Sequence, residues 1–78
     1  MTTESGKPRG FLTVMSQPSG ATVELDGGYV GKTPLVLEHA FDRRDYRLAV
    51  LMDGYRLWEK EVSPDPVSRS INQVAVLE

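Results

Sequence analysis

Residues 18–35 constrain the fold most, because turn-forming residues recur there at intervals the length of a short strand. This segment, PSGATVELDGGYVGKTPL, holds four of the seven glycines and two of the five prolines. Proline fixes φ at about −65° and glycine tolerates positive φ, so the Pro-Ser-Gly of residues 18–20 predicts a turn. Asp26-Gly27-Gly28 predicts a hairpin, with either Asp26-Gly27 or Gly27-Gly28 at its centre. The segment therefore predicts strands joined by tight turns.

The rest of the chain alternates apolar and polar residues over short intervals, which is the period of a strand covered on one face. Strands are expected at residues 10–17, 21–25, 35–38, 46–52, 55–62 and 68–77, with one very short return strand after Gly28. No window has a sustained helical period, and the prolines at positions 64 and 66 cannot continue a ladder. The sequence predicts an all-β fold, a small and mainly antiparallel β-sandwich of six or seven strands.

One face of each strand is expected to contribute to a core between the two sheets. The expected core residues are Leu12, Val14, Ala21, Val23, Leu25, Leu35, Leu37, Leu48, Val50, Trp58, Val62 and Val74. In the last strand we expect Ile71, Val74 and Val76 to be buried. The first strand has apolar groups on both faces, which leaves two alternatives open. Either it is covered on both sides, or Phe11 and Met15 form a contact patch for a partner.

The only tryptophan, Trp58, lies in a strand whose register depends on the preceding turn. A two-residue Asp53-Gly54 loop would place Trp58 outside between two cations, as a platform for a sugar ring or a partner's side chain. A three-residue loop with Gly54 left-handed in a bulge would bring Trp58 and Val62 into the core. Enclosing the largest side chain stabilises a small sandwich by about 3 kcal/mol, so we favour the core position.

The composition fits one small domain and excludes several classes of protein. Seventy-eight residues make one domain, and the absence of cysteine excludes disulfides and cysteine-based zinc sites. A net charge of −2, with acids and bases interspersed, does not provide the basic face of a nucleic-acid binder. No apolar run reaches the length of a membrane span, and no signal peptide is evident. We expect residues 1–9 to be a disordered leader or linker, and residues 10–78 to be a domain excised from a longer protein.

Two groups of residues resemble functional motifs but do not satisfy them. The Gly-Lys-Thr of residues 31–33 ends like a phosphate-binding loop, yet an aspartate stands where the first glycine belongs and a proline prevents the following helix. His39, the only histidine, has Glu38 and Asp42 nearby in the sequence, which makes a weak candidate for a metal site. One histidine without a suitable nucleophile makes no catalytic triad. We therefore expect no catalytic residue, no metal and no cofactor.

The tetrapeptide Pro18-Ser19-Gly20-Ala21 belongs to a longer set of residues that follow a fixed order. The other members are Leu12, Val14, Ser16, Val23, Asp26, Gly27, Gly31, Thr33, Pro34, Tyr46, Leu48, Val50, Gly54, Tyr55 and Val62. This set resembles the PEGA domain, a small bacterial β-sandwich module named for a Pro-Glu-Gly-Ala tetrapeptide. The resemblance extends from Gly10 to the C-terminus. It departs from the family at residues 42–45, where Asp-Arg-Arg-Asp stands near a usual glycine.

The resemblance implies a non-catalytic protein-interaction or spacer module of a larger bacterial protein, either envelope-associated or attached to a signalling protein such as a Ser/Thr kinase. The alternative is binding of carbohydrate or cell wall through exposed aromatic residues. We expect a protein partner that the sequence does not identify, no nucleic-acid partner and no insertion of this domain into a membrane. From their chemistry, the candidate partner contacts are Tyr29, Arg43, Arg44, Arg56 and Trp58.

Overall fold

A computed structural model describes residues 9–42 and 44–78, which form seven strands. The strands are β1 (Gly10–Gln17), β2 (Thr22–Leu25), β3 (Gly28–Lys32), β4 (Leu35–His39), β5 (Tyr46–Leu51), β6 (Trp58–Val62) and β7 (Ile71–Val76). Among these residues there is no helix that could span a membrane. The expected leader falls outside the described residues except for Arg9, so it stays a prediction.

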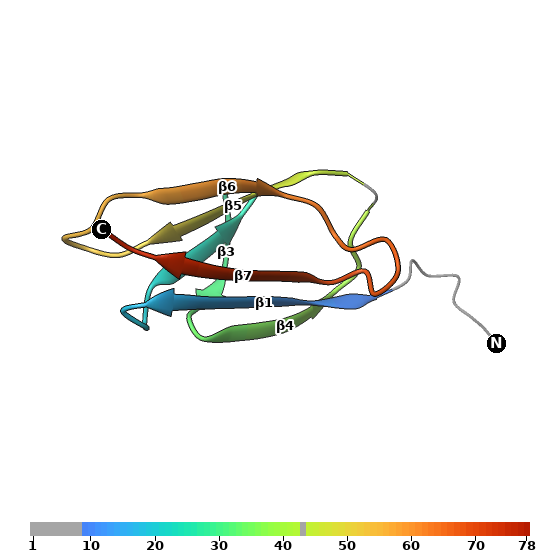
Figure 1. Cartoon of the computed structure of the whole chain (residues 1–78), viewed down its shortest axis with the longest axis horizontal. Helices are drawn as coiled ribbons and strands as arrows, with labels where there is room; N and C mark the ends of the chain where they lie inside the picture. The colour runs from blue at the N-terminus through green and yellow to red at the C-terminus, as the bar shows by residue number, and fades with distance from the viewer. Residues whose placement is uncertain (1–8, 43) are drawn as a thin grey trace.

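The strands form two sheets that stack as a sandwich (Figure 1). One sheet has three strands in the order β4-β1-β7, and the other has four in the order β3-β2-β5-β6. β1 and β7 run parallel, whereas every other pair of neighbouring strands runs antiparallel. The expected small and mainly antiparallel β-sandwich is confirmed.

The turn between β2 and β3 is centred on Asp26 and Gly27. Both have positive φ, at 51° and 84°, and the flanking Leu25 pairs with Gly28. Two successive positive φ angles are what a two-residue hairpin with a right-handed twist needs. The register then shifts, because Val23 pairs with Gly31 while the next residue of β2 pairs with Tyr29. β3 therefore contains a bulge, and it is longer than the very short return strand that we expected.

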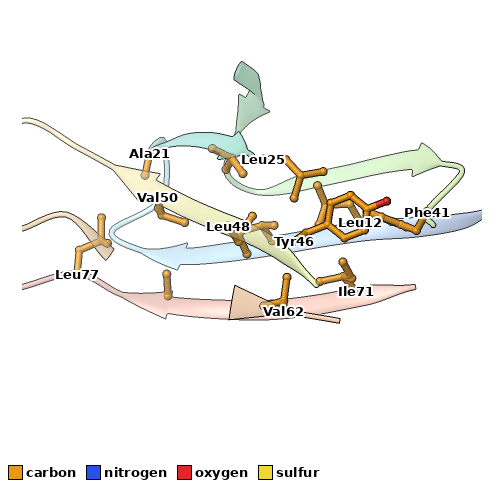
Figure 2. Close-up of a cluster of buried hydrophobic side chains, with 13 residues drawn as sticks. Leu12, Ala21, Leu25, Phe41, Tyr46, Leu48, Val50, Val62, Ile71 and Leu77 are labelled. Atoms are coloured by element: carbon orange, nitrogen blue, oxygen red, sulfur yellow. The ribbon is translucent and has the colours of Figure 1, made fainter. Parts of the chain in front are cut away.

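The core lies between the sheets and draws on both (Figure 2). Its buried members are Leu12, Val14, Ala21, Val23, Leu25, Phe41, Tyr46, Leu48, Val50, Val62, Ile71, Ala75 and Leu77. Leu35, Leu37 and Trp58 are half-buried and pack against this cluster. Most of the expected core is confirmed, and Phe41, which precedes β5 in a connection without regular structure, adds a large buried side chain.

The expected burial of Val74 and Val76 in β7 is wrong. Both side chains are exposed, whereas Ile71, Ala75 and Leu77 are buried. Side chains alternate between faces along a strand, and β7 pairs with β1 so that Ile71 lies beside Leu12 on the core side. A residue three positions after Ile71 must then face outward. The burial of Leu77 also shows that the last residues take part in the fold.

The hairpin of β5 and β6 places Trp58 on the core side, as we favoured. Val50 pairs with Trp58 and Tyr46 pairs with Val62, so these four residues share one face. Gly54 has a φ of +86°, which fits the expected left-handed glycine. The connection is longer than a three-residue bulged loop, however, because the β5–β6 ladder ends at the Val50–Trp58 pair, and the Tyr55 N–H donates to the carbonyl of Met52 at 3.0 Å to close a separate turn at the tip. The predicted face is confirmed, and the predicted turn length is wrong.

Candidate interaction site

The residues of the tetrapeptide segment are held by one buried hydroxyl, that of Thr33. Its Oγ1 accepts the N–H groups of Gly20 and Ala21, both at 3.0 Å, and lies 2.5 Å from Ser16 Oγ. Ser16 Oγ donates to the carbonyl of Pro18 at 2.7 Å, so the hydrogen between the two hydroxyls must come from Thr33. This network ties the turn after β1 to the turn after β3. Residues of the tetrapeptide, on which the family resemblance rests, therefore help to stabilise the fold.

A second polar cluster joins the β2–β3 turn to the start of β5. Asp26 Oδ1 accepts the backbone N–H of Arg47 at 2.9 Å, and Asp26 Oδ2 lies 2.9 Å from Arg44 Nη2. The Arg47 hydrogen bond first, and then the Arg44 hydrogen bond, hold the pKa of Asp26 below its usual value. The Arg44 guanidinium also stacks over the Tyr46 ring, 3.9 Å from its centroid.

The predicted contact residues that the structure describes do not all lie on one surface. Tyr29 is exposed on β3, at one edge of the four-stranded sheet, and Arg43 lies outside the described residues. Arg44 is engaged within the chain through Asp26, as described above. None of these placements tests whether the residues contact a partner, so that role stays a prediction.

Arg56 and Trp58 are the two predicted contact residues that line a common hollow. It has a volume of about 150 Å³ and is also lined by Leu57, Val76, Leu77 and Glu78. The Arg56 backbone N–H donates to the carbonyl of Glu78 at 2.6 Å, which ties the loop before β6 to the residue that ends the chain. Trp58 contributes the exposed part of a side chain that otherwise packs against the core. The hollow is smaller than the roughly 300 Å³ that small-molecule sites usually need.

A larger hollow, of about 540 Å³, lies beside the outer face of the four-stranded sheet. It is lined by Gly20, Thr22, Lys32, Leu51, Met52, Asp53, Tyr55 and Leu57. Its lining mixes a cation, an anion and apolar groups. Among the described residues, no group of three histidine, cysteine, aspartate or glutamate side chains could hold a metal ion. This hollow therefore shows neither a metal centre nor a catalytic grouping of acid, base and nucleophile.

The outer face of the three-stranded sheet is the more distinctive surface. Its exposed apolar side chains are Phe11, Met15, Val36, Val74 and Val76, each between 40% and 65% exposed. β1 is the central strand, and Met15 pairs with Val74 while Thr13 pairs with Val36. The side chains thus gather on one side of three adjacent strands. The sequence suggested part of this surface through Phe11 and Met15, but the valines of β7 were assigned to the core.

This apolar face carries little charge. Among the described residues of β1, β4 and β7, Glu38 is the only charged side chain on the outward positions, and its carboxylate lies 3.4 Å from Arg9 Nε at the margin. The opposite sheet differs, because its outer face includes the Arg47–Glu59 ion pair at 3.5 Å. An apolar surface with so few charges on a small domain is typical of a protein contact site.

The fold and its surfaces define a small all-β module, compatible with a non-catalytic domain attached to other parts of a protein. The PEGA domain family model matches residues 9–74. Because this match covers most of the chain, the chain belongs to the PEGA domain family. No curated protein and no solved structure matches the chain.

Proposed function

We propose that this domain is a non-catalytic interaction module of a larger bacterial protein, and that the outer face of the three-stranded sheet contacts a protein partner. The observation that supports this most is the exposure of Phe11, Met15, Val36, Val74 and Val76 on one face. Membership of a family of small modules agrees with it. The parent protein that we expect is envelope-associated, or a signalling protein such as a Ser/Thr kinase.

The chemistry of this face specifies the kind of surface that fits it. Met15 and Val74 present apolar area without a charge beside them, because the nearby outward residues of β1 and β7 are neutral. Glu38, which pairs with Phe11, is the one charged outward side chain among the described residues of these strands, and it lies at the margin beside Arg9. A charged partner surface would lose its hydration there without gaining an opposite charge. The partner should therefore present an apolar and uncharged surface of folded protein.

The carbohydrate alternative has less support. It depended most on an outward Trp58 between cations, and Trp58 instead pairs with Val50 on the core side of β6. Tyr29 and Tyr55 remain exposed, but we prefer the protein partner because a larger apolar surface lies on the other sheet.

Photo-crosslinking in the cell tests the proposed surface. p-Benzoylphenylalanine would replace Phe11 in the full-length parent protein, and in a matched variant it would replace Tyr29, an exposed aromatic residue on the opposite sheet. We expect a discrete adduct from position 11 that disappears when Val74→Asp is added, and none from position 29. This expectation replaces the sequence-based prediction that Tyr29 contacts the partner. An adduct from position 29 alone would place the contact on the other sheet and contradict the proposal.

A further inference from the structure

The two edges of the four-stranded sheet are protected against pairing with another strand. β3 contains the bulge opposite Val23 and Glu24, which interrupts its register. On β6, Lys60 pairs with Leu48 and so lies on the core-facing side, yet it is exposed at the edge between Glu59 and Glu61. Bulges and inward charges are the devices by which natural sheets prevent edge-to-edge association.

The free edge of β7 has neither device. β7 pairs with β1 in an unbroken register from Ile71 to Val76, and its sequence INQVAV contains no charge and no proline. The other edge of this sheet, β4, is also free of bulges but carries Glu38, which is paired with Arg9. Among the described edges, β7 is therefore the one most open to another strand, as far as Val76. Beyond Val76, the carbonyl of Glu78 already accepts the Arg56 N–H.

The backbone groups that β7 offers can be identified. The N–H of Leu77 donates to Gln17 on β1 at 2.9 Å. Because bonding groups alternate along a strand, the N–H and C=O groups of Asn72, Val74 and Val76 point away from β1, toward the free edge. The side chains of Val74 and Val76 are exposed on the outer face beside that edge. A strand added here would satisfy backbone groups and cover apolar side chains together.

We propose that a second copy of this chain adds at this edge, with β7 of one copy antiparallel to β7 of the other. The inference goes beyond the proposed function, because the pairing uses the edge of β7 and leaves Phe11 and Met15 on the outer face open to a further partner. The two sheets would join in the order β4-β1-β7-β7-β1-β4. A two-fold axis at Val74 pairs Val74 with its equivalent and Asn72 with Val76, so all three free-edge residues of each copy are used. An uncharged strand suits self-pairing, because no like charges face each other.

Backbone methylation tests the edge without changing any side chain. The chain of 78 residues would be synthesised with an N-methyl group on Val74, and sedimentation velocity would be recorded up to about 1 mM. We expect the unmodified chain to form a reversible dimer. The N-methyl group should raise the dissociation constant of this dimer about tenfold or more. The matched control is N-methyl Val36, whose N–H points to the free edge of β4 by the same alternation. It should leave the dimer unchanged.

A second variant covers the case in which N-methyl Val74 fails to fold, as monitored by Trp58 fluorescence. Gln73→Lys gives β7 an inward charge at the edge, the arrangement that Lys60 already provides on β6. We expect it to weaken the dimer by a similar factor. A monomer at every concentration overturns the inference, as does a dimer that survives both changes or one that only N-methyl Val36 disrupts. A monomeric chain that still crosslinks from Phe11 in the cell would retain the proposed function, so the two proposals fail separately.

Discussion

Thr33 shows how one side chain holds two turns together. Its buried hydroxyl accepts the N–H groups of Gly20 and Ala21 and is also hydrogen-bonded to the hydroxyl of Ser16. Thr33→Val keeps the shape of the side chain but removes this hydroxyl, which leaves the buried Ala21 N–H without its partner. We expect the free energy of unfolding to fall by about 1–3 kcal/mol, measured by urea titration. Thr33→Ser retains the hydroxyl and should cost clearly less. Equal losses in the two variants would contradict the role that we assign to the hydroxyl.

Asp26 gives the stability a dependence on acid pH. Its pKa is lowered, so its ionised form stabilises the fold at neutral pH, and this contribution is lost as the pH falls through that lowered value. Asp26→Asn removes the charge that pairs with Arg44. Because the pair is partly exposed, we expect a loss of at most about 1 kcal/mol at pH 7. The difference from wild type should shrink at about pH 2.5, where urea titration would be repeated. A difference that is independent of pH would show that the charge is not the cause.

At the scale of elements, two glycines test different constraints. A Cβ at Gly10 would lie 2.0 Å from the carbonyl oxygen of Arg69, so the start of β1 needs close approach to the loop before β7. Gly54 has open space around it but a φ of +86°. We expect Gly54→Ala to cost about 1 kcal/mol, from backbone strain alone. Gly10→Ala should lower the free energy of unfolding by more, about 2 kcal/mol or above, because the backbone at Arg69 must move to make room for the Cβ. Thermal unfolding of both variants shows which one is less stable. A larger loss for Gly54→Ala than for Gly10→Ala would contradict the close packing of this loop on β1.

The turns and most strands could be predicted because their causes are local. Asp26, Gly27 and Gly54 adopt the positive φ that their residue types permit. The parity of the β5–β6 hairpin left both faces open for Trp58, and the gain from burying this large side chain selected the correct one. The face of β7 could not be predicted, because its parallel pairing with β1 joins segments far apart in the chain. Thr33 was recognised as part of the family's set of residues, but its hydroxyl acts only once two separate turns meet. The apolar face could be recognised only after the face of β7 was corrected, which placed Val74 on the same side as Phe11 and Met15.

For the whole molecule, the structure divides its apolar residues between two tasks. One set fills the space between the sheets, and Leu12, Leu48 and Val50 in it are fully buried. The other set, represented by Phe11 and Val74, lies on the outer face of the three-stranded sheet and leaves much of its area in water. A small domain gains little stability from side chains that remain exposed. The central claim is therefore that the outer face serves association rather than folding.

The most direct test of this claim is the free energy of unfolding of the double variant Phe11→Thr, Val74→Thr, measured by urea titration at a concentration where the chain is monomeric. Threonine keeps the β-branched shape that suits a strand while it removes apolar area. We predict a value within about 0.5 kcal/mol of the wild type, as for substitutions away from the core. A loss of several kcal/mol would show that the outer face is part of what holds the domain together, and it would contradict the account.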